Sequence, residues 1–313
     1  MRRIDLLIDQ SRRATENEDY TENSGIDPEE FIQYINDGQD RIESAINSKS
    51  PMTFIREKEI DIVQNQEAYD MPFDIYMGTN IVNVEFSNSG RISDYYRLKQ
   101  RQIFERINSS SGSIFPSFFI RRNNQVMLQP PAATGKIRVN YVRKLPRLDI
   151  RRGTVLSVSL DITNKKINSL ILDEGSTLYS EELSSEEYLT VVDRLGNIKM
   201  AKVLIDGVAS NGVVTVDSSF VYDSGETIEV GDYVARGNNS TTHSMLSDIC
   251  ERYLVSYMNW KILKRDSSVD SEEQERELSG IESDILNMYS EPDSTHDGIP
   301  IINSDDFYVG EWW

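Results

Sequence analysis

Six short β-strand patterns follow one another between Gly153 and Gly237, and helical patterns stand on both sides of them. Gly, Asn, Asp and Ser separate each pattern from the next. Regular short strands with turn residues between them are typical of a small sandwich or barrel. Because the stretch lies between a strand and a returning helix, it predicts a domain inserted into a larger parent. The strands are expected at residues 155–160, 169–172, 188–192, 199–205, 213–216 and 227–234.

Two helices are predicted before these strands. Residues 2–14 place their apolar side chains on one face, which indicates an amphipathic helix. The run Asp27-Pro28-Glu29-Glu30 is a helix start, because its Asp can cap the helix and its Pro suits the first helical position. This second helix is expected to reach about Ser48. Gly38 lies within its apolar stripe, where it lets another backbone come close.

Short alternating segments between residues 53 and 150 predict antiparallel strands. Asn123-Asn124 stands between two of these segments, which is a hairpin signal. A short helix is expected at residues 94–108. After the inserted stretch, a helix is expected from Ser240, and a last helix from Ser271, where a capping-box pattern occurs.

The predicted fold class is therefore α+β: a helical bundle with an antiparallel β region, plus an inserted small all-β sandwich or barrel domain. Residues 1–152 and 238–290 are expected to form the parent core, and residues 153–237 the inserted domain. Residues 291–313 show no clear pattern and are expected to form a C-terminal arm.

The composition argues against several classes of protein. No apolar run approaches the ~20 residues that span a bilayer, so no membrane partner is expected. Asp5 and Asp9 interrupt the stretch that a signal peptide would need, so export is not indicated. The single cysteine, Cys250, lies on an apolar helix face and is expected to be a buried thiol. His243, at a helix start, is expected to be a neighbour of the cap.

The sequence contains no phosphate-binding loop, dinucleotide fingerprint, nucleophile elbow or zinc-protease motif. The chain has only two histidines, and their spacing does not suit a metal. Acidic residues are plentiful and none stands out as a catalytic pair. We therefore expect no enzyme, no catalytic residues, no cofactor and no metal site.

Charge is unevenly distributed along the chain. The formal net charge is -19, yet residues 91–152 contain 14 Lys or Arg and only 3 Asp or Glu. Such a basic segment can face a nucleic acid or the acidic surface of another copy, and it can equally be a solvated surface. The residues expected to form a basic partner-binding surface are Arg121, Arg122, Arg138, Arg143, Lys144, Arg147, Arg151 and Arg152.

Four aromatic residues end the polar arm: Phe307, Tyr308, Trp312 and Trp313. Exposed termini gain little from large aromatic side chains, whereas aromatics are the usual anchors of interfaces. These four residues are therefore expected to dock on a partner or a neighbouring subunit. The alternative is that the arm folds back on its own domain.

Several motifs, in this order, resemble those of bacteriophage head-to-tail adaptor proteins, which are also called connector or tail tubular proteins. The segment from Asp27 to Asp40, with Asn36-Asp37-Gly38-Gln39, is similar to a helix near the start of the proteins of that family. Tyr69-Asp70-Met71-Pro72 and the hairpin from Phe118 to Tyr141 look like its later segments. The resemblance covers about the first 150 residues and residues 240–290. Residues 153–237 depart from the short members of the family.

The resemblance implies a structural virion protein that forms a ring, typically dodecameric, at the head–tail junction. Such a ring docks under the portal, joins the head to the tail and forms part of the DNA ejection channel. Its partners would be copies of itself, the portal and downstream tail or nozzle proteins, with DNA only as passing cargo. Assembly would take place in the host cytoplasm. Two alternatives stay open: a tail protein that binds or cleaves glycans through the β domain, and a nucleic-acid-binding module that uses the basic segment.

Overall fold

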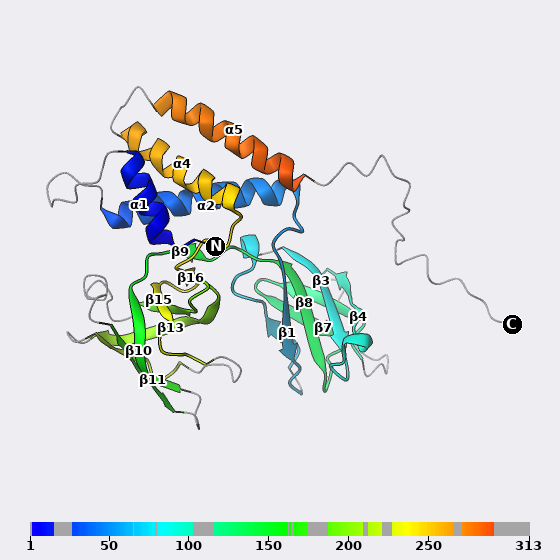
Figure 1. The fold of residues 1–313 in the computed structure, drawn as a ribbon. Helices are drawn as coiled ribbons and strands as arrows, with labels where there is room; N and C mark the ends of the chain where they lie inside the picture. Colours follow the sequence, from blue (N-terminus) through cyan, green and yellow to red (C-terminus); the bar gives the residue numbers. More distant parts are fainter. Residues whose placement is uncertain are drawn as a thin grey trace.

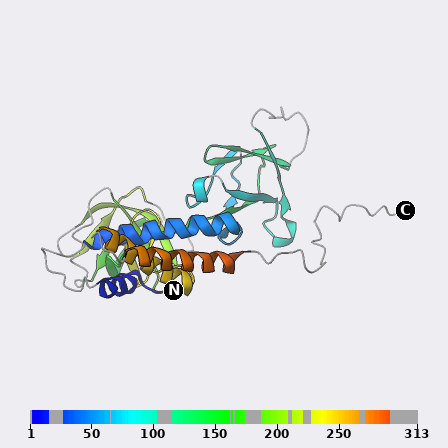
Figure 2. The same ribbon diagram turned by 90° about the horizontal axis from the view of Figure 1, so that it is seen from above.

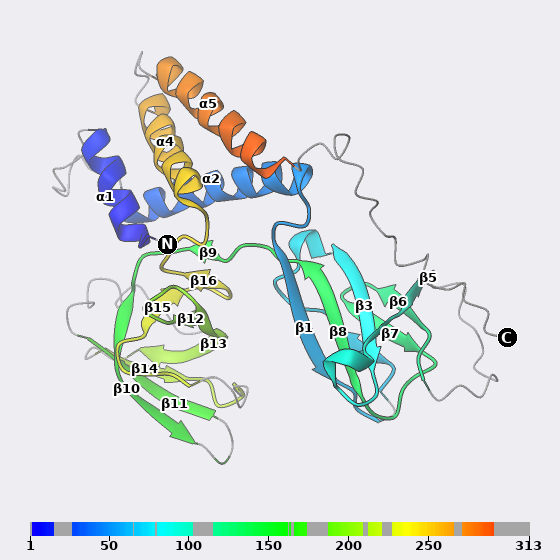
Figure 3. The same ribbon diagram turned by 45° about the vertical axis from the view of Figure 1, so that its right-hand side comes forward.

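A computed structural model describes residues 2–15, 27–64, 66–78, 80–102, 115–161, 163, 166–173, 187–208, 212–220, 227–265 and 271–290. Figure 1 shows a layer of helices with two separate β bodies below it. The first body in the chain, which we call the β lobe, contains strands β1 to β8 between residues 55 and 142. The second body is a barrel formed by strands β10 to β15 between residues 153 and 236. The segment that joins the two bodies passes directly under the helical layer (Figure 3).

Four helices are described in the helical layer: α1 (Ile4–Ala14), α2 (Pro28–Lys49), α4 (Asp248–Arg265) and α5 (Ser271–Tyr289). The predicted start of α2 is confirmed, because the side chain of Asp27 accepts a hydrogen bond from Glu29 N at 3.1 Å. The helix predicted from Ser240 begins later, at Asp248. The reason is that Ser240 and Thr241 first form strand β16, which pairs with an earlier strand.

Helix α4 is central to the helical core. It packs against α1, α2 and α5, and its apolar side chains are therefore buried all round rather than along one stripe. Cys250 is completely buried, as expected for a structural thiol. In Figure 3 the other helices fan out across α2, so the predicted arrangement as a helical bundle is not confirmed. None of the described helices is long and apolar enough to cross a membrane.

The β lobe contains two four-stranded sheets. The first has the order β1-β8-β3-β4 and the second β2-β7-β6-β5. All neighbours are antiparallel except β5 and β6, and side chains from both sheets share one core. The strands are β1 (Ile55–Asp61), β2 (Ala68–Asp70), β3 (Ile81–Ser87), β4 (Tyr96–Arg97), β5 (Lys99–Arg101), β6 (Phe118–Arg122), β7 (Gln125–Gln129) and β8 (Lys136–Val142).

Two local predictions for the β lobe meet different outcomes. The hairpin at Asn123-Asn124 is confirmed: it joins β6 to β7, and Asn123 adopts the left-handed backbone that tight turns require. The helix predicted at residues 94–108 is wrong where the structure describes it. Residues 96–97 form β4, which pairs with β3 of the first sheet, and residues 99–101 form β5, which pairs with β6 of the second. Residues 103–108 lie outside the described residues.

The second β body is a closed barrel with the strand order β10-β11-β14-β13-β12-β15. This confirms a barrel as the architecture of the predicted β stretch. Its last strand begins at Tyr233 rather than Thr227, because residues 229–232 turn the chain, with Glu229 N donating to Asp232 Oδ2. The strands are β10 (Gly153–Asp161), β11 (Lys166–Leu172), β12 (Tyr188–Val192), β13 (Ile198–Val208), β14 (Val213–Val216) and β15 (Tyr233–Arg236).

Gly38 in α2 meets a side chain of α4 rather than a backbone. A Cβ at this position would lie 3.0 Å from Tyr257 Cδ1, which is closer than ordinary van der Waals contact. In α5, by contrast, a Cβ at Gly280 would meet nothing within 4 Å. The two helical glycines therefore form a matched pair, one packed and one open.

We expect Gly38→Leu to lower the free energy of unfolding by about 1–3 kcal/mol, because the added side chain forces α2 and α4 apart. Gly280→Leu is the control and is expected to be neutral or to stabilise by up to about 1 kcal/mol through its better helix propensity. Urea denaturation followed by circular dichroism measures both changes. Equal stabilities of the two variants would contradict the close contact.

Candidate functional site

The candidate site is built around the strap, which we define as residues 143–152. The strap leaves β8, runs along α2 and enters the barrel at β10 (Figure 3). Within it, β9 (Arg147–Leu148) pairs in parallel with β16 (Ser240–Thr241), where the chain returns from the barrel. Both connections of the barrel to the rest of the chain therefore pass through this point.

Polar side chains of α2 hold the backbone of the strap. Asn36 Nδ2 donates to Leu148 O at 2.8 Å, and Asn36 Oδ1 accepts from Leu148 N at 2.9 Å. One turn further along α2, Gln39 Nε2 donates to Pro146 O at 2.8 Å. Both side chains are buried. A buried backbone group must find a partner, and here the helix supplies partners that a neighbouring strand would normally supply.

Glu43 adds a carboxylate to the same row. It accepts a hydrogen bond from Leu145 N at 2.7 Å, and only 1 % of the residue is exposed. Burial raises its pKa to about 7, although the bond from Leu145 N and the charge of Lys144 oppose the shift. Asn36, Gln39 and Glu43 follow one another at helical spacing, so they share one face of α2. We call this row the polar ladder.

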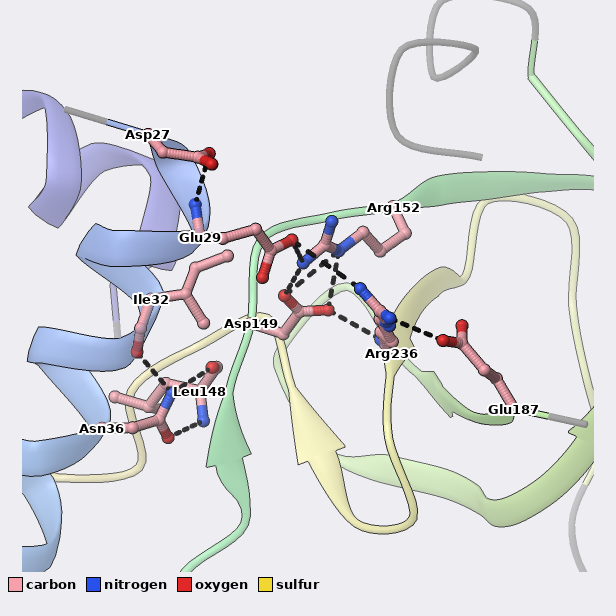
Figure 4. Close-up of polar contacts among 9 residues, drawn as sticks. All are labelled: Asp27, Glu29, Ile32, Asn36, Leu148, Asp149, Arg152, Glu187 and Arg236. Carbon is pink, nitrogen blue, oxygen red and sulfur yellow. Dashed lines mark hydrogen bonds and ion pairs between the residues drawn. The ribbon is translucent and has the colours of Figure 1, made fainter. Parts of the chain in front are cut away.

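A buried arginine closes the far end of the strap. Arg152 is 1 % exposed, and its guanidinium donates to Asp149 Oδ1 at 2.8 Å and to Glu29 Oε1 at 2.6 Å. Figure 4 shows Asp149 turned toward Arg236 as well, whose backbone N–H donates to its Oδ2 at 2.7 Å. The Arg236 side chain in turn reaches Glu187 at 2.5 Å. This cluster, in which Arg152 and Asp149 are buried, ties α2, the strap and the barrel together.

The charge of Arg152 is secured by its partners. Burial alone would lower its pKa, but the hydrogen bonds and negative charges of Asp149 and Glu29 outweigh that effect and raise it. A buried cation with two carboxylate neighbours is stable as a unit, whereas removing one member leaves an uncompensated buried charge. The barrel is therefore held at its base by a group that stays ionised.

An open groove of about 980 Å³ lies beside the strap. Its walls come from α2, the strap, the β-lobe loop at residues 73–75 and the barrel residues 236–240. Lys202 of the barrel points across it, with Nζ 4.4 Å from the ring centre of Phe73 in the β lobe. The groove thus lies where the three parts of the chain meet.

The structure does not gather the predicted basic residues into one surface. The prediction is wrong for Arg152, which is buried because Asp149 and Glu29 surround its charge. Lys144 and Arg147 lie on the rim of the groove and share one carboxylate, Asp40, at 3.7 and 3.2 Å.

The remaining predicted basic residues are spread over separate places. Arg138 lies on the first sheet between Glu57 and Glu59, at 3.0 and 3.1 Å. Arg121 donates to Gly78 O at 3.1 Å. The others are Arg122, which is exposed, Arg143, which is half-buried, and Arg151, whose guanidinium lies 5.6 Å from the ring centre of Tyr233. The role of the basic residues in binding a partner stays a prediction. The predicted anchors of the arm, Phe307, Tyr308, Trp312 and Trp313, lie outside the described residues.

Within the part of the chain that the structure describes, the candidate metal ligands, Cys250 and His243 do not form a metal site or a site with an activated nucleophile. Among the described residues, no group of three His, Cys, Asp or Glu side chains could hold a metal ion. Burial raises the pKa of the Cys250 thiol, which disfavours the reactive thiolate. His243 is buried, and desolvation lowers its pKa. Its backbone forms an isolated β-bridge with Arg3, just before α1. The expected place of His243 at the start of the following helix is not confirmed, because α4 begins only at Asp248.

Sequence reasoning missed the polar ladder, although its signal was visible. Asn36 and Gln39 belong to the quoted motif Asn36-Asp37-Gly38-Gln39, but the helix was interpreted through its apolar stripe alone. The structure shows that the motif serves two faces of α2. Gly38 faces Tyr257 of α4, while Asn36 and Gln39 face the strap.

Residues 3–161, just over half of the chain, match the family model described as SU10 adaptor protein. The matched region contains α1, α2, the whole β lobe, the polar ladder and the strap, and it ends with β10, the first strand of the barrel. No curated protein matches the chain.

We expect Arg152→Met to lower the free energy of unfolding by about 3–5 kcal/mol, because it leaves the buried carboxylate of Asp149 without its cation and removes the partner of the half-exposed Glu29. The control is Arg122→Met, which removes an exposed arginine from the same predicted set and is expected to change stability by no more than about 0.5 kcal/mol. Urea denaturation measures both values. Hydrogen exchange should also show faster opening at residues 147–153 and 234–241 in Arg152→Met alone.

Glu43 is expected to make stability depend on pH. Its folded pKa of about 7 lies above its ordinary value of 4.5, so the folded chain holds a proton that the unfolded chain has lost between these values. Stability therefore falls as pH rises from 4.5 to 7. Glu43→Gln keeps the acceptor for Leu145 N, and we expect it to raise stability above pH 7 and to flatten this part of the profile.

Denaturation midpoints measured from pH 4.5 to 8 test the role of Glu43. Glu272→Gln, which neutralises an exposed carboxylate of α5, is the control and should leave the slope of the wild type unchanged. A slope that is the same in Glu43→Gln and in the wild type would contradict the assignment.

Proposed function

The chain belongs to the SU10 adaptor protein family of bacteriophages, and from this membership we propose that it forms a ring under the portal. The family is structural, and its members belong to the head–tail junction of the virion. We propose that the ring joins the head to the tail, forms part of the DNA ejection channel and presents a platform for the next tail or nozzle protein.

The observation that carries the proposal is the family match over residues 3–161, together with what that region does in the structure. It contains both α2 and the strap, so most of the side chains that hold the strap and the base of the barrel lie in the shared region, although β16 and Arg236 lie beyond it. A chain organised around a rigid junction of three bodies suits a protein that works by assembly.

Charge supports a ring built from two different faces. Figure 2 shows the β lobe and α5 on opposite sides of α2. α5 exposes acidic residues such as Glu273 and Asp284, whereas Arg97, Lys99 and Arg122 are exposed on the β lobe. Head-to-tail contacts between copies require two unlike faces, and opposite charges favour such a pairing.

The overall charge suits a channel through which DNA passes. Proteins that hold DNA neutralise phosphates with Lys and Arg, so a chain with a net charge of -19 is poorly suited to retain it. We propose that residues 1–152 and 238–290 form the adaptor core in this ring. Residues 153–237 would project from it as an inserted domain that contacts another tail component, and residues 291–313 would dock on the portal or a neighbouring subunit.

Purified protein mixed with portal-bearing heads tests the proposal. Electron microscopy should show a ring of this chain at the portal vertex. We expect the variant with Trp312→Ala and Trp313→Ala to stay folded but to join heads to tails several-fold less well, because it lacks the aromatic anchors. The control combines Ile301→Ala with Ile302→Ala, which truncates two apolar residues of the same arm and keeps its aromatic residues. A wild-type chain absent from the vertex would overturn the adaptor role, and normal joining by the tryptophan variant would overturn only the arm.

A further inference from the structure

The groove beside the strap has an unbalanced set of charges at its rim. Of its acidic residues, Glu29 and Asp149 are engaged by Arg152, and Asp74 is engaged by Arg56 at 3.1 Å. The fourth acidic residue of the groove, Asp37, is paired with Lys261 at 3.8 Å. These carboxylates therefore have little free charge to offer a ligand. The acidic side of the groove is already neutralised from within the chain.

The basic residues at the rim of the groove have fewer carboxylate partners than its acidic residues have cations. Lys144 and Arg147 share the single carboxylate of Asp40, and their side chains are 44 % and 52 % exposed. Lys202 is also exposed, and its recorded partner is the ring of Phe73 rather than a carboxylate of the described residues. Phe73 itself is 49 % exposed. A half-exposed aromatic ring next to cations suits a ligand that is both acidic and aromatic.

The arm at residues 291–313 has this chemistry. It contains no Lys or Arg and carries the acidic residues Glu291, Asp293, Asp297, Asp305, Asp306 and Glu311. Its aromatic residues, Phe307, Tyr308, Trp312 and Trp313, flank the last three of these. The final stretch of the arm thus carries acidic groups next to aromatic rings. This matches the groove, which offers cations next to the aromatic ring of Phe73.

The arm also starts within reach of the groove. α5 ends at Tyr289, whose hydroxyl lies 3.5 Å from Ser247 Oγ. Ser247 follows the groove residue Ser240 by seven positions, which can span at most about 25 Å. The arm, fully extended, reaches on the order of 75 Å. A tether of this length holds the arm at a high effective concentration near its own groove.

We infer that the groove beside the strap is the docking site for the chain's own C-terminal arm in the free subunit. The acidic groups of the arm meet Lys144, Arg147 and Lys202, and an aromatic side chain packs on Phe73. This inference goes beyond the proposed ring, because it concerns the chain before assembly. Docking covers the aromatic residues of the arm, which would otherwise be an exposed apolar patch on a free subunit.

Cross-linking within the full chain tests the inference. One variant combines Val309→Cys in the arm with Asn238→Cys in the groove, and the control combines Val309→Cys with Ser159→Cys, an exposed position on β10 of the barrel. The native Cys250 is buried and should not react with a short bismaleimide. We expect a monomer-sized cross-linked product that is several-fold more abundant for the groove pair than for the control pair.

Charge reversal in the groove-pair background tests the proposed contacts. Adding Lys144→Glu and Lys202→Glu should reduce the product several-fold, whereas Lys58→Glu, at an exposed site on β1, should not. Salt at about 1 M should also reduce it, because the Debye length falls to about 3 Å. Circular dichroism confirms that each variant is folded.

Each outcome of the cross-linking experiment points to a different conclusion about where the arm docks. Equal yields at Asn238→Cys and Ser159→Cys would overturn the groove as the docking site. A product of dimer size alone would assign the groove to the arm of a second copy and overturn docking on the same chain. No portal or head takes part in the experiment, so its failure leaves the adaptor proposal standing, and failure of the adaptor proposal leaves this result intact.

Discussion

The buried guanidinium of Arg152 is the contact on which the arrangement of the chain depends. It lies between Asp149 of the strap and Glu29 of α2, and Asp149 also binds the backbone of Arg236 at the end of the barrel. Buried ion pairs add little net stability compared with apolar packing, but they are costly to break or to misplace. The cluster therefore acts mainly as a constraint on geometry. It links the barrel to the helices through contacts at both connections of the barrel.

The polar ladder supplies hydrogen-bond partners to the buried backbone of the strap. A connecting segment that passes under a helical layer buries its N–H and C=O groups, and each of these needs a partner. Only two residues of the strap form a strand, β9, so a sheet cannot satisfy the rest. Asn36, Gln39 and Glu43 supply the missing partners from α2. Burial in this position raises the pKa of the Glu43 carboxyl group. In return, the backbone of the strap is held at Leu145, Pro146 and Leu148.

Local signals in the sequence predicted local structure well. The helix start at Asp27, the hairpin at Asn123-Asn124 and the β stretch that forms the barrel each follow from nearby residues. Prediction failed where distant partners decide. Residues 96–97 and 99–101 form strands because each sheet offered an edge to pair with. Arg152 was expected on the surface as part of the basic segment, and arginine is rarely buried without a partner. Its partner Glu29 stands 123 positions away, and Leu148 stands 112 positions from Asn36. No periodicity reveals such pairs.

The boundary of the family match separates two kinds of structure within the chain. The matched region ends at residue 161, the last residue of β10, so it includes the polar ladder, Arg152 and the base of the barrel, but not most of the barrel itself. The shared part therefore contains Glu29, Asp149 and Arg152, whereas their barrel partner Arg236 lies beyond it. Because Arg152 and Asp149 stand before the barrel and Arg236 closes it, the base is fixed from both connections. The surface that the barrel presents is consequently oriented by α2, even though α2 contributes none of that surface.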